Sequence, residues 1–510
     1  MSTIMVINMG LKSIRCILFN HLGIKMGTSA VAINTAINDK RVEQNPAEWW
    51  EKAEAVMKNA CKDANVKRVD YVTVTTSASC LVCMDGNGNA LTNAYMVSDK
   101  RAEQETREIK QLPMFQEVKR KTGLDVSVSL MLPKILWVKR HLPDVFDKTH
   151  YFVTPNDYLI YHLCGRVVTD YFNAIKYHYF LEEKKYPLEL LDKLQIDEKK
   201  LPDVILPGEI AGKISKTLAQ KLEINEDAQV VVSSYDAICS FVGSGVSEEG
   251  EASDVSGTVT VLRAFSRKTN LKNSNKVYSV PFYQENAKIV GGSNNMGGGL
   301  IEWVKQCYYQ YDQWPYEIME KDARESEIGA RGLIFLPYLL GERAPLWDDN
   351  ARGVFFGLER MHTRKDMTRA VFESTGFIDR DMIRAISETG VEIQSVRLSG
   401  GLARLNLISQ IKADILGKDV MVLSEFETTA SGAAMMVLLG QKEYDSLKQI
   451  SEHFAKVRMI IRPDAENHRK YEYMYELYRD TYGSLKEMFA RRTATLEKIR
   501  SEREVRIENL

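Results

Sequence analysis

Two short turns in this sequence combine a glycine with side chains that can donate hydrogen bonds to an anion. The first follows an apolar run and contains Gly10, with Lys12 and Arg15 close behind it; the second contains Gly257 and Thr258. Backbone N–H groups exposed at a glycine, with a cation or hydroxyl nearby, are suited to holding phosphate oxygens. The two turns therefore suggest a site for a triphosphate, although the first is equally well read as an ordinary hairpin turn with two solvated cations.

A third glycine turn follows the strand-like segment VRLS and contains Gly400 and Gly401 before the helical run RLNLISQIKADIL. Without side chains, this backbone would let a flat base such as adenine lie against it. Glycine at a strand-to-helix turn also has a purely conformational explanation. The segment ENAKIVGGSNNMGGG predicts one more short strand that runs into a glycine-rich turn.

Asp236 is the candidate for a catalytic base. It follows the buried-looking strand QVVVSSY and precedes the helical segment AICSFVGSG, so its carboxylate is expected at a strand end beside a helix N-terminus. The alternative is that Asp236 only caps this helix. Phosphoryl transfer needs donors for the phosphates, a metal ion and a base at the acceptor hydroxyl, and these residues could supply such a set.

Motifs of several other chemistries do not occur. The sequence has no GxSxG, no GxxxxGK[ST] and no HExxH. Cys80 and Cys83 form a lone CxxC without a second pair or a histidine pair to complete a zinc site, so we interpret them as two thiols in or beside a strand.

The elements that must position these residues have an α/β pattern. The segments IMVINMG and RCILFNHLG predict an opening hairpin, NPAEWWEKAEAVMKNACKDA predicts a helix on its sheet, and further helices are expected at 100–122 and 131–146. A fresh strand series from EASDVSGTVTVLRAF predicts a second domain, which the small-residue helix TTASGAAMMVLLG closes. We expect domains at 1–250 and 251–485 and a charged tail at 486–510.

Composition limits the class of protein. A chain of 510 residues with 44% hydrophobic side chains can bury more than one core. With 68 Lys and Arg against 69 Asp and Glu, the net charge of -1 offers no general attraction for nucleic acid or an anionic membrane. Seven cysteines and no signal-like or membrane-spanning apolar run favour the cytoplasm.

These motifs occur in the order and spacing of the FGGY family of carbohydrate kinases, which the chain resembles over roughly residues 4 to 485. The most specific matches are GVFFGL at 353–358, followed by DMTRAVFE at 366–373, and LPYLLGERAP at 336–345. The last two segments are expected to build the core of the second domain and a hinge region. The resemblance implies two actin-like, ribonuclease H-like domains, with ATP and a sugar in a cleft between them.

Family roles pass to the matching positions. The resemblance implies that Asp236 is the base and that Gly257 and Thr258 hold the transferred phosphate. It places Gly400, Gly401 and, less directly, Asn406 at the adenosine, and Gly298 in a glycine turn near the nucleotide. Asp99 and Arg101, in the stretch SDKR, and Trp50 or its neighbours are implied to contact the sugar. Asn8 and Asp236 are implied to help bind Mg²⁺, with Gly10, Lys12 and Arg15 at the phosphates.

The chain also departs from the family. At the first phosphate turn it has Asn8-Met9-Gly10-Leu11-Lys12-Ser13 instead of Asp-x-Gly-Thr-Thr-Ser, which removes one carboxylate and two hydroxyls. Asparagine keeps an oxygen ligand but not the charge, so the affinity for the metal should fall, and Lys12 could compensate at a phosphate. The first family signature is incomplete around 134–137.

The substrate region differs as well. The run Thr75-Thr76-Ser77-Ala78-Ser79-Cys80 replaces the Ser-Gly-Gln-Met-His-Gly of xylulokinases, and the Arg-Glu pair of glycerol kinases is missing. We therefore expect a hydroxyl-rich pocket that accepts an unusual ketose or polyol. The alternatives are a pseudokinase that binds nucleotide or sugar as a regulator, favoured by Asn8, and an actin-like ATPase with a protein client. A homodimer is a further expectation.

Overall fold

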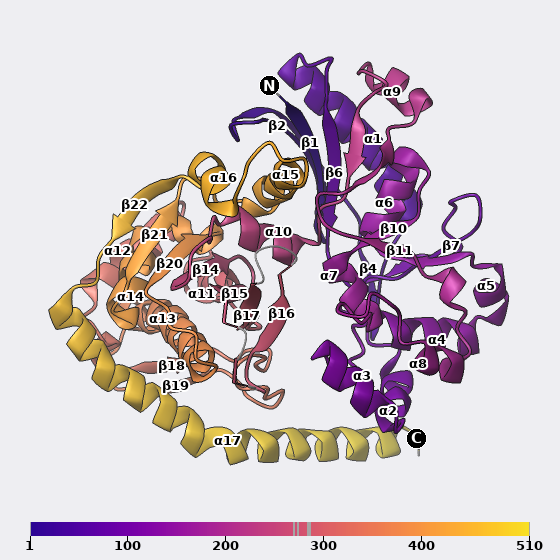
Figure 1. Ribbon diagram of the computed structural model, residues 1–510. Helices are drawn as coiled ribbons and strands as arrows, with labels where there is room; N and C mark the ends of the chain where they lie inside the picture. The colour runs from indigo at the N-terminus through magenta and orange to yellow at the C-terminus, as the bar shows by residue number, and fades with distance from the viewer. Residues whose placement is uncertain (1, 269–270, 273–274, 283–286, 509–510) are drawn as a thin grey trace. The chain divides into compact units, whose positions relative to one another are not determined.

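The chain folds into two compact units (Figure 1). The computed structural model describes residues 2–268, 271–272, 275–282 and 287–508. Unit 1 contains Met1–Gly245 and Glu427–Ala455, and unit 2 contains Val246–Phe426 and Lys456–Leu510. The first change of unit lies five residues before the division expected at 250. The later return of the chain to unit 1 differs from the expected single division.

Unit 1 is built on a six-stranded sheet in the order β12-β13-β6-β1-β2-β3. The predicted opening hairpin is confirmed, because β1 and β2 pair antiparallel, and β6 and β13 continue the sheet parallel to β1. The strands are β1 (Thr3–Met9), β2 (Ser13–Asn20), β3 (Lys25–Ala32), β6 (Tyr71–Thr76), β12 (Ile210–Lys213) and β13 (Gln229–Val231).

Helices cover both faces of this sheet (Figure 1). On one face lie the predicted helix α1 (Pro46–Ala64) and α6 (Pro155–Cys164), and on the other lie α10 (Asp236–Gly243) and α15 (Thr428–Gly440). Helix α1 begins where the Asn45 side chain accepts a hydrogen bond from the N–H of Ala47, and its buried residues pack on β2 and β3.

Helix α15 was expected to close the second domain. By its packing it groups with unit 1, where it lies against α10, and its assignment to the second domain stays a prediction. A Cβ at Gly243 would lie 1.9 Å from the carbonyl oxygen of Thr428, and a Cβ at Gly432 would lie 1.7 Å from that of Cys239. Only glycine allows these two helices to approach so closely, which explains the small residues of the segment.

The remaining elements of unit 1 surround the sheet edge. The predicted helical stretches at 100–122 and 131–146 each form two helices, because Pro113 and Pro143 interrupt them. Cys83 lies in β7, Cys80 precedes it, and both are buried free thiols, which confirms their interpretation. The elements are α2 (Glu103–Gln111), α3 (Phe115–Thr122), α4 (Met131–His141), α5 (Pro143–Lys148), α7 (Tyr171–Ala174), α8 (Leu188–Leu194), α9 (Lys216–Leu222), α16 (Leu447–Phe454), β4 (Ala36–Asn38), β5 (Arg41–Gln44), β7 (Val82–Met84), β8 (Ala94–Tyr95), β9 (Tyr151–Val153), β10 (Val168–Asp170) and β11 (Asp203–Ile205).

Unit 2 repeats the same topology. Its seven-stranded sheet has the order β16-β17-β15-β14-β20-β21-β22. As in unit 1, three antiparallel strands adjoin two parallel strands and a final antiparallel one, and only β16 is additional. The strands are β14 (Glu251–Ser256), β15 (Thr260–Ser266), β16 (Tyr278–Pro281), β17 (Lys288–Ser293), β20 (Ser395–Ser399), β21 (Asp419–Leu423) and β22 (Val457–Ile461).

The segment 366–373 lies in the core of unit 2, as expected, whereas Phe356 and Leu358 of the segment 353–358 are exposed. The segment 366–373 lies in the long helix α13, where the guanidinium of Arg369 bonds the buried carboxylate of Glu373 and the hydroxyl of Tyr471. A capping box formed by Thr363 and Asp366 begins this helix. The elements are α11 (Gly298–Tyr308), α12 (Pro315–Glu325), α13 (Arg364–Glu388), α14 (Asn406–Leu416), α17 (Ala465–Glu508), β18 (Ile334–Leu336) and β19 (Val354–Phe356).

The charged residues after 485 are not separate from unit 2. They continue α17, whose first half packs on α14 and β18. Within the described residues, no helix is both long and apolar enough to cross a membrane.

Candidate active site

The turn between β1 and β2 has the open backbone that anion binding requires. The N–H of Gly10 donates to the carbonyl of Ser13 at 3.0 Å, and no atom lies within 4 Å of the position that a Cβ would take at Gly10. Lys12 is exposed beside it. Arg15, in β2, forms an ion pair with Glu427 at the start of α15. Of the two cations predicted for this turn, Arg15 is thus held by a carboxylate of its own unit.

Gln44 supports this turn, a role that no local sequence pattern predicts. Its side-chain amide donates to the carbonyl oxygen of Leu11 at 3.0 Å, and its own oxygen accepts a hydrogen bond from the buried indole of Trp49 at 2.9 Å. Trp50, predicted at the sugar, instead stacks on His162 of α6, with 4.9 Å between ring centroids. The NPAEWW segment therefore reaches the phosphate turn through Trp49, and a sugar contact of Trp50 stays a prediction.

Asp236 lies at a helix N-terminus, as predicted, but the strand before it is shorter than predicted, because β13 ends at Val231 and the loop 232–235 follows it. It is the first residue of α10, with Tyr235 in the capping position, and is half-buried. The hydroxyl of Ser77, just after β6, donates to the Asp236 carboxylate at 3.2 Å. Asn8 near the end of β1 pairs with Thr75 of β6. Because β1, β6 and β13 are parallel, Asn8, Ser77 and Asp236 share the carboxyl edge of the sheet, where α/β proteins bind ligands.

A buried polar cluster fixes the loop that carries Asp236. The carboxylate of Asp170 accepts hydrogen bonds from the Ser234 hydroxyl at 2.8 Å and from the side-chain amide of Asn173 at 2.6 Å. Burial raises the pKa of Asp170 to about 6, although these hydrogen bonds oppose the shift. Asp170 therefore orders the approach to Asp236, a role that only the tertiary structure shows.

The predicted sugar-binding pair Asp99 and Arg101 forms a buried ion pair. The Asp99 side chain is 0% exposed and accepts two bonds of 2.8 Å from the Arg101 guanidinium. Burial alone would raise the pKa of Asp99, but the bonds from Arg101 and from the N–H of Val42 lower it. The guanidinium also lies 3.8 Å from the ring centroid of Tyr95. The structure thus gives the pair a positioning role, and its contact with sugar hydroxyls stays a prediction.

In unit 2 the predicted glycine turns come together. The N–H of Gly298 donates to the carbonyl oxygen of Gly257 at 2.7 Å, while the N–H groups of Gly297 and Gly299 donate to that of Thr258 at 2.8 and 3.1 Å. The β14–β15 turn therefore lies on the N-terminus of α11, whose backbone dipole favours an anion. Thr258 is exposed, so its hydroxyl is accessible.

The third glycine turn, which contains Gly400 and Gly401, packs against the β14–β15 turn. Gly400 has φ of +87°, and a Cβ there would lie 2.5 Å from the carbonyl oxygen of Ser256, the residue before Gly257. A Cβ at Gly401 would lie 3.9 Å from the same oxygen. The three glycine turns thus form one cluster within unit 2, which we call the glycine cluster. It consists of residues 256–258, 297–299 and 400–401.

Asn406, predicted near the adenosine, begins α14 and is exposed. Its side-chain oxygen accepts a hydrogen bond of 3.4 Å from Arg458, which also donates to the carbonyl oxygen of Ala403. The guanidinium groups of Arg404 and Arg458 lie 4.9 and 5.4 Å from the ring centroid of Phe426. An aromatic ring and two planar cations therefore border the Gly400 turn, which is the kind of surface on which a base can stack.

Buried charge lies beneath the glycine cluster. The ammonium of Lys412, which is 1% exposed, pairs with Asp254 and lies 2.6 Å from a carboxylate oxygen of Asp379. It also donates to the Ser256 hydroxyl at 3.1 Å. Burial alone would lower the pKa of Lys412, but the two carboxylates raise it. A charged ammonium thus ties α14 to β14 directly below the phosphate turn.

The donor set at the edge of unit 1 is compatible with magnesium. Asn8 and Asp236 offer an amide and a carboxylate oxygen, the hard ligands that Mg²⁺ prefers, and Mg²⁺ usually takes only one or two protein ligands beside substrate phosphates. In the described ranges, no group of three or more His, Cys, Asp or Glu side chains could hold a metal ion by itself.

Comparisons with known proteins decide the family. Residues 3–243 match the N-terminal domain of the FGGY family of carbohydrate kinases, and residues 253–440 match its C-terminal domain. The chain belongs to the FGGY family of carbohydrate kinases. The two matches confirm the resemblance found in the sequence motifs, and together they span most of the chain.

Individual relatives agree with this assignment. A xylulose kinase from Staphylococcus xylosus is 27% identical over 484 residues, covering 94% of this chain and 100% of the relative. A glycerol kinase from Saccharolobus islandicus is 29% identical over 441 residues, covering 84% and 86%. The crystal structure of gluconate kinase from Lactobacillus acidophilus has a TM-score of 0.87 at 23% identity and covers 96% of this chain and 99% of that one.

This FGGY protein is therefore an α/β protein of two actin-like, ribonuclease H-like domains, as predicted. It is a carbohydrate kinase, an enzyme that transfers a phosphoryl group from ATP to a hydroxyl of a small sugar or polyol. Nothing in these comparisons supports the alternative of a pseudokinase.

Proposed function

We propose that the glycine cluster of unit 2 binds the nucleotide of this FGGY kinase and that the Asp236 edge of unit 1 binds the sugar. The observation that carries the proposal is the hydrogen bonding between the turns at 257–258 and 297–299, because it brings the backbone of Gly257, Thr258 and Gly298 together at a helix N-terminus. Gly400, Gly401 and Asn406 would line the adenosine, and Gly10 and Lys12 would add donors for phosphate oxygens. The expectation that the turns at Gly10 and Gly257 face each other stays a prediction.

Asp236 would accept the proton of the attacked hydroxyl. Its place at the start of α10 fixes its backbone, and the hydrogen bond from Ser77 orients its carboxylate. A base held in this way contributes by aligning the hydroxyl oxygen for in-line attack. The polar cluster around Asp170 limits movement of the preceding loop.

ATP and Mg²⁺ are the proposed donor and metal. Asn8 and Asp236 would hold the ion together with phosphate oxygens, and the ion would supply charge neutralisation at those oxygens. Because Asn8 lacks the charge of the aspartate that the family has there, we expect a higher metal requirement. Arg15 could join the phosphate donors only after release from Glu427.

The proposed substrate is a small ketose or polyol. Relatives of this chain act on xylulose, glycerol and gluconate. At the run that follows β6, Ser77 is the half-buried hydroxyl bonded to Asp236, whereas Thr75, Thr76 and Ser79 are buried. A small hydroxyl next to the base leaves room for a substrate and can share hydrogen bonds with it. A homodimer and the absence of nucleic-acid binding stay predictions.

The proposal is tested by measuring ADP release over a panel of ketoses, polyols and sugar acids, with Mg²⁺ varied. We expect at least one ketose or polyol to give turnover far above the ATPase rate without sugar. Turnover that is equal with and without every member of the panel would contradict the proposal. A matched Asn8→Asp variant tests the metal site, because it should lower the Mg²⁺ concentration needed for half-maximal rate.

A further inference from the structure

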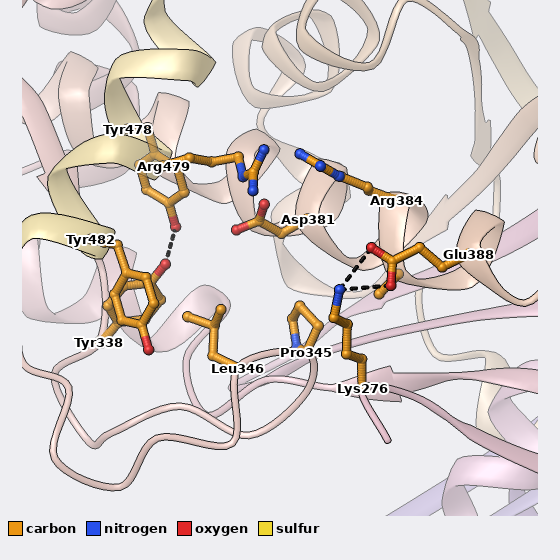
Figure 2. Close-up of a pocket in the computed structure, with 12 residues that line it drawn as sticks. Lys276, Tyr338, Pro345, Leu346, Asp381, Arg384, Glu388, Tyr478, Arg479 and Tyr482 are labelled. Atoms are coloured by element: carbon orange, nitrogen blue, oxygen red, sulfur yellow. Dashed lines mark hydrogen bonds and ion pairs between the residues drawn. The ribbon is translucent and has the colours of Figure 1, made fainter. Parts of the chain in front are cut away.

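A cavity of unit 2 lies between α13, α17 and the loop after β18, and its volume is about 230 Å³. Its wall includes Pro345 and Leu346 from the loop and the rings of Tyr338, Tyr478 and Tyr482 (Figure 2). This size suits a small metabolite rather than a large ligand. None of these residues belongs to the glycine cluster or to the Asp236 edge.

Two guanidinium groups converge in this cavity. Figure 2 shows the side chains of Arg384 from α13 and Arg479 from α17 pointing toward each other above the carboxylate of Asp381. In the part of the chain that the structure describes, neither guanidinium forms an ion pair with a carboxylate, although the charge of Arg384 acts on Asp381. That charge opposes the rise that burial causes in the pKa of Asp381, and the guanidinium of Arg479 lies 6.0 Å from the ring centroid of Tyr475. Neither contact occupies the guanidinium N–H groups with a hydrogen-bonded carboxylate, so both guanidinium groups can donate to a phosphate.

The other ionisable groups of the cavity are already engaged. Lys276 forms an ion pair with Glu388 at 2.6 Å, and one oxygen of Asp381 accepts a bond of 2.6 Å from the hydroxyl of Tyr475. The Asp381 carboxylate would oppose an anion. Burial raises the pKa of Asp381 to about 6, so protonation of this group beside a bound anion costs less than for an ordinary aspartate.

Tyrosine hydroxyls provide neutral partners. The hydroxyls of Tyr338 and Tyr478 share a hydrogen bond of 2.6 Å, and that of Tyr482 donates to Asp348 at 2.9 Å. Each of these oxygens can accept a further hydrogen bond. The lining of the cavity thus combines two guanidinium groups with several phenol groups that can form hydrogen bonds with the hydroxyls of a small polyol.

We propose that this cavity binds a phosphate group, carried by a small hydroxylated ester or free in solution, with Arg384 and Arg479 holding its oxygens. Guanidinium groups that approach from two helices match the several oxygens of a tetrahedral phosphate. A phosphorylated sugar would place its hydroxyls against the tyrosines. Free phosphate would use the arginines alone.

The cavity is connected to the glycine cluster within unit 2. From the loop that carries Pro345, the guanidinium of Arg343 donates to the side-chain oxygen of Asn295 at 2.6 Å. Gly297 lies two residues after Asn295, and its N–H donates to the carbonyl oxygen of Thr258 in the glycine cluster. A ligand that shifts this loop would therefore alter the proposed nucleotide site. The effect on turnover, but not the binding itself, rests on the proposed function.

Binding is tested by calorimetric titration of the whole protein with inorganic phosphate and, separately, with ribose 5-phosphate. ADP is kept saturating so that the glycine cluster is occupied. The test variant is Arg384→Gln with Arg479→Gln, and the control is Arg492→Gln, an exposed arginine on α17 outside the cavity. The double variant removes two charge-assisted hydrogen-bond donors, so we expect it to weaken binding at least about tenfold.

The outcomes distinguish a phosphate ester from free phosphate as the ligand, and they distinguish failure of this site from failure of the proposed kinase activity. Tighter binding of ribose 5-phosphate than of phosphate identifies an ester, and equal affinity identifies the phosphate group alone; both support the site if only the double variant loses binding. Equal affinity in the double variant and the control overturns the proposal, as does the absence of binding to wild type at millimolar ligand. Because the titration does not use turnover, a failed kinase assay would leave this result intact.

Discussion

Replacing Lys412 with methionine should destabilise unit 2 more than any surface substitution. The change removes the ammonium that pairs with both Asp254 and Asp379 while keeping a side chain of similar length. Breaking a buried ion pair by removal of one partner costs about 3 to 5 kcal/mol, because a charge is left buried without compensation. Here two carboxylates are left together, and burial and Asp254 already raise the pKa of Asp379.

The expected loss can be read as a shift in melting temperature. A domain of this size loses about 2 to 4 °C per kcal/mol, so unit 2 should melt on the order of 10 °C lower. Hydrogen exchange at the amides of β14 and α14 would report the loss in unit 2 separately from unit 1. The matched control is Lys321→Met, an exposed lysine of α12, which should change the melting temperature little.

A second variant makes the reasoning refutable. Adding Asp379→Asn to Lys412→Met removes one of the two stranded carboxylates, so the double variant should recover part of the lost stability. If Lys412→Met costs less than about 1 kcal/mol, or if Asp379→Asn makes it still less stable, the ammonium does not balance the two charges as described.

Two further substitutions test the glycine cluster and the loop beside it. Gly400→Ala should raise the Kd for ADP at least about tenfold, because its Cβ would displace Ser256 in addition to the cost of about 1 to 2 kcal/mol for φ of +87°. The control is Gly390→Ala, where φ is +94° but the Cβ would stand in open space. Equal effects of the two substitutions on the Kd in calorimetry would refute the contact with Ser256. Burial raises the pKa of Glu342 to about 7, above its ordinary value of 4.5, so its folded form retains the proton and the free energy of unfolding should fall as pH rises from about 4.5 to about 7. Glu342→Gln should flatten urea-unfolding free energies measured across that range, and an unchanged slope would show that another group causes it.

Local patterns predicted the secondary structure around the candidate residues where one segment determines it. The hairpin turn at Gly257, the strand-to-helix turn at Gly400 and the helix that begins at Asp236 all follow from apolar runs that end in glycine or aspartate. These features depend on residues next to one another in the sequence. They could therefore be found without knowledge of the rest of the chain.

Contacts between distant segments could not be predicted in this way. The sequence of α15 predicts a buried helix of small residues, but it does not show that α10 is the helix on which α15 packs. Gly432 contacts Gly243 only because the chain returns to unit 1 at residue 427. The pairing of Lys412 with Asp254 joins residues far apart in sequence, and a lysine in a helix is usually exposed. Which of Trp49 and Trp50 supports the turn at Gly10 depends on which face of α1 is turned toward that turn. The structure turns Trp49 toward Gln44.

The most direct test of the account is the turnover of an Asp236→Asn variant, measured as sugar-dependent ADP release together with the Kd for ADP. A positioned base contributes typically about 10² to 10⁴ in rate, so we predict a loss of kcat in that range with a nearly unchanged Kd. Asp227→Asn, an exposed aspartate of unit 1, should keep both values. Sugar phosphorylation by Asp236→Asn at close to the wild-type rate would contradict the account.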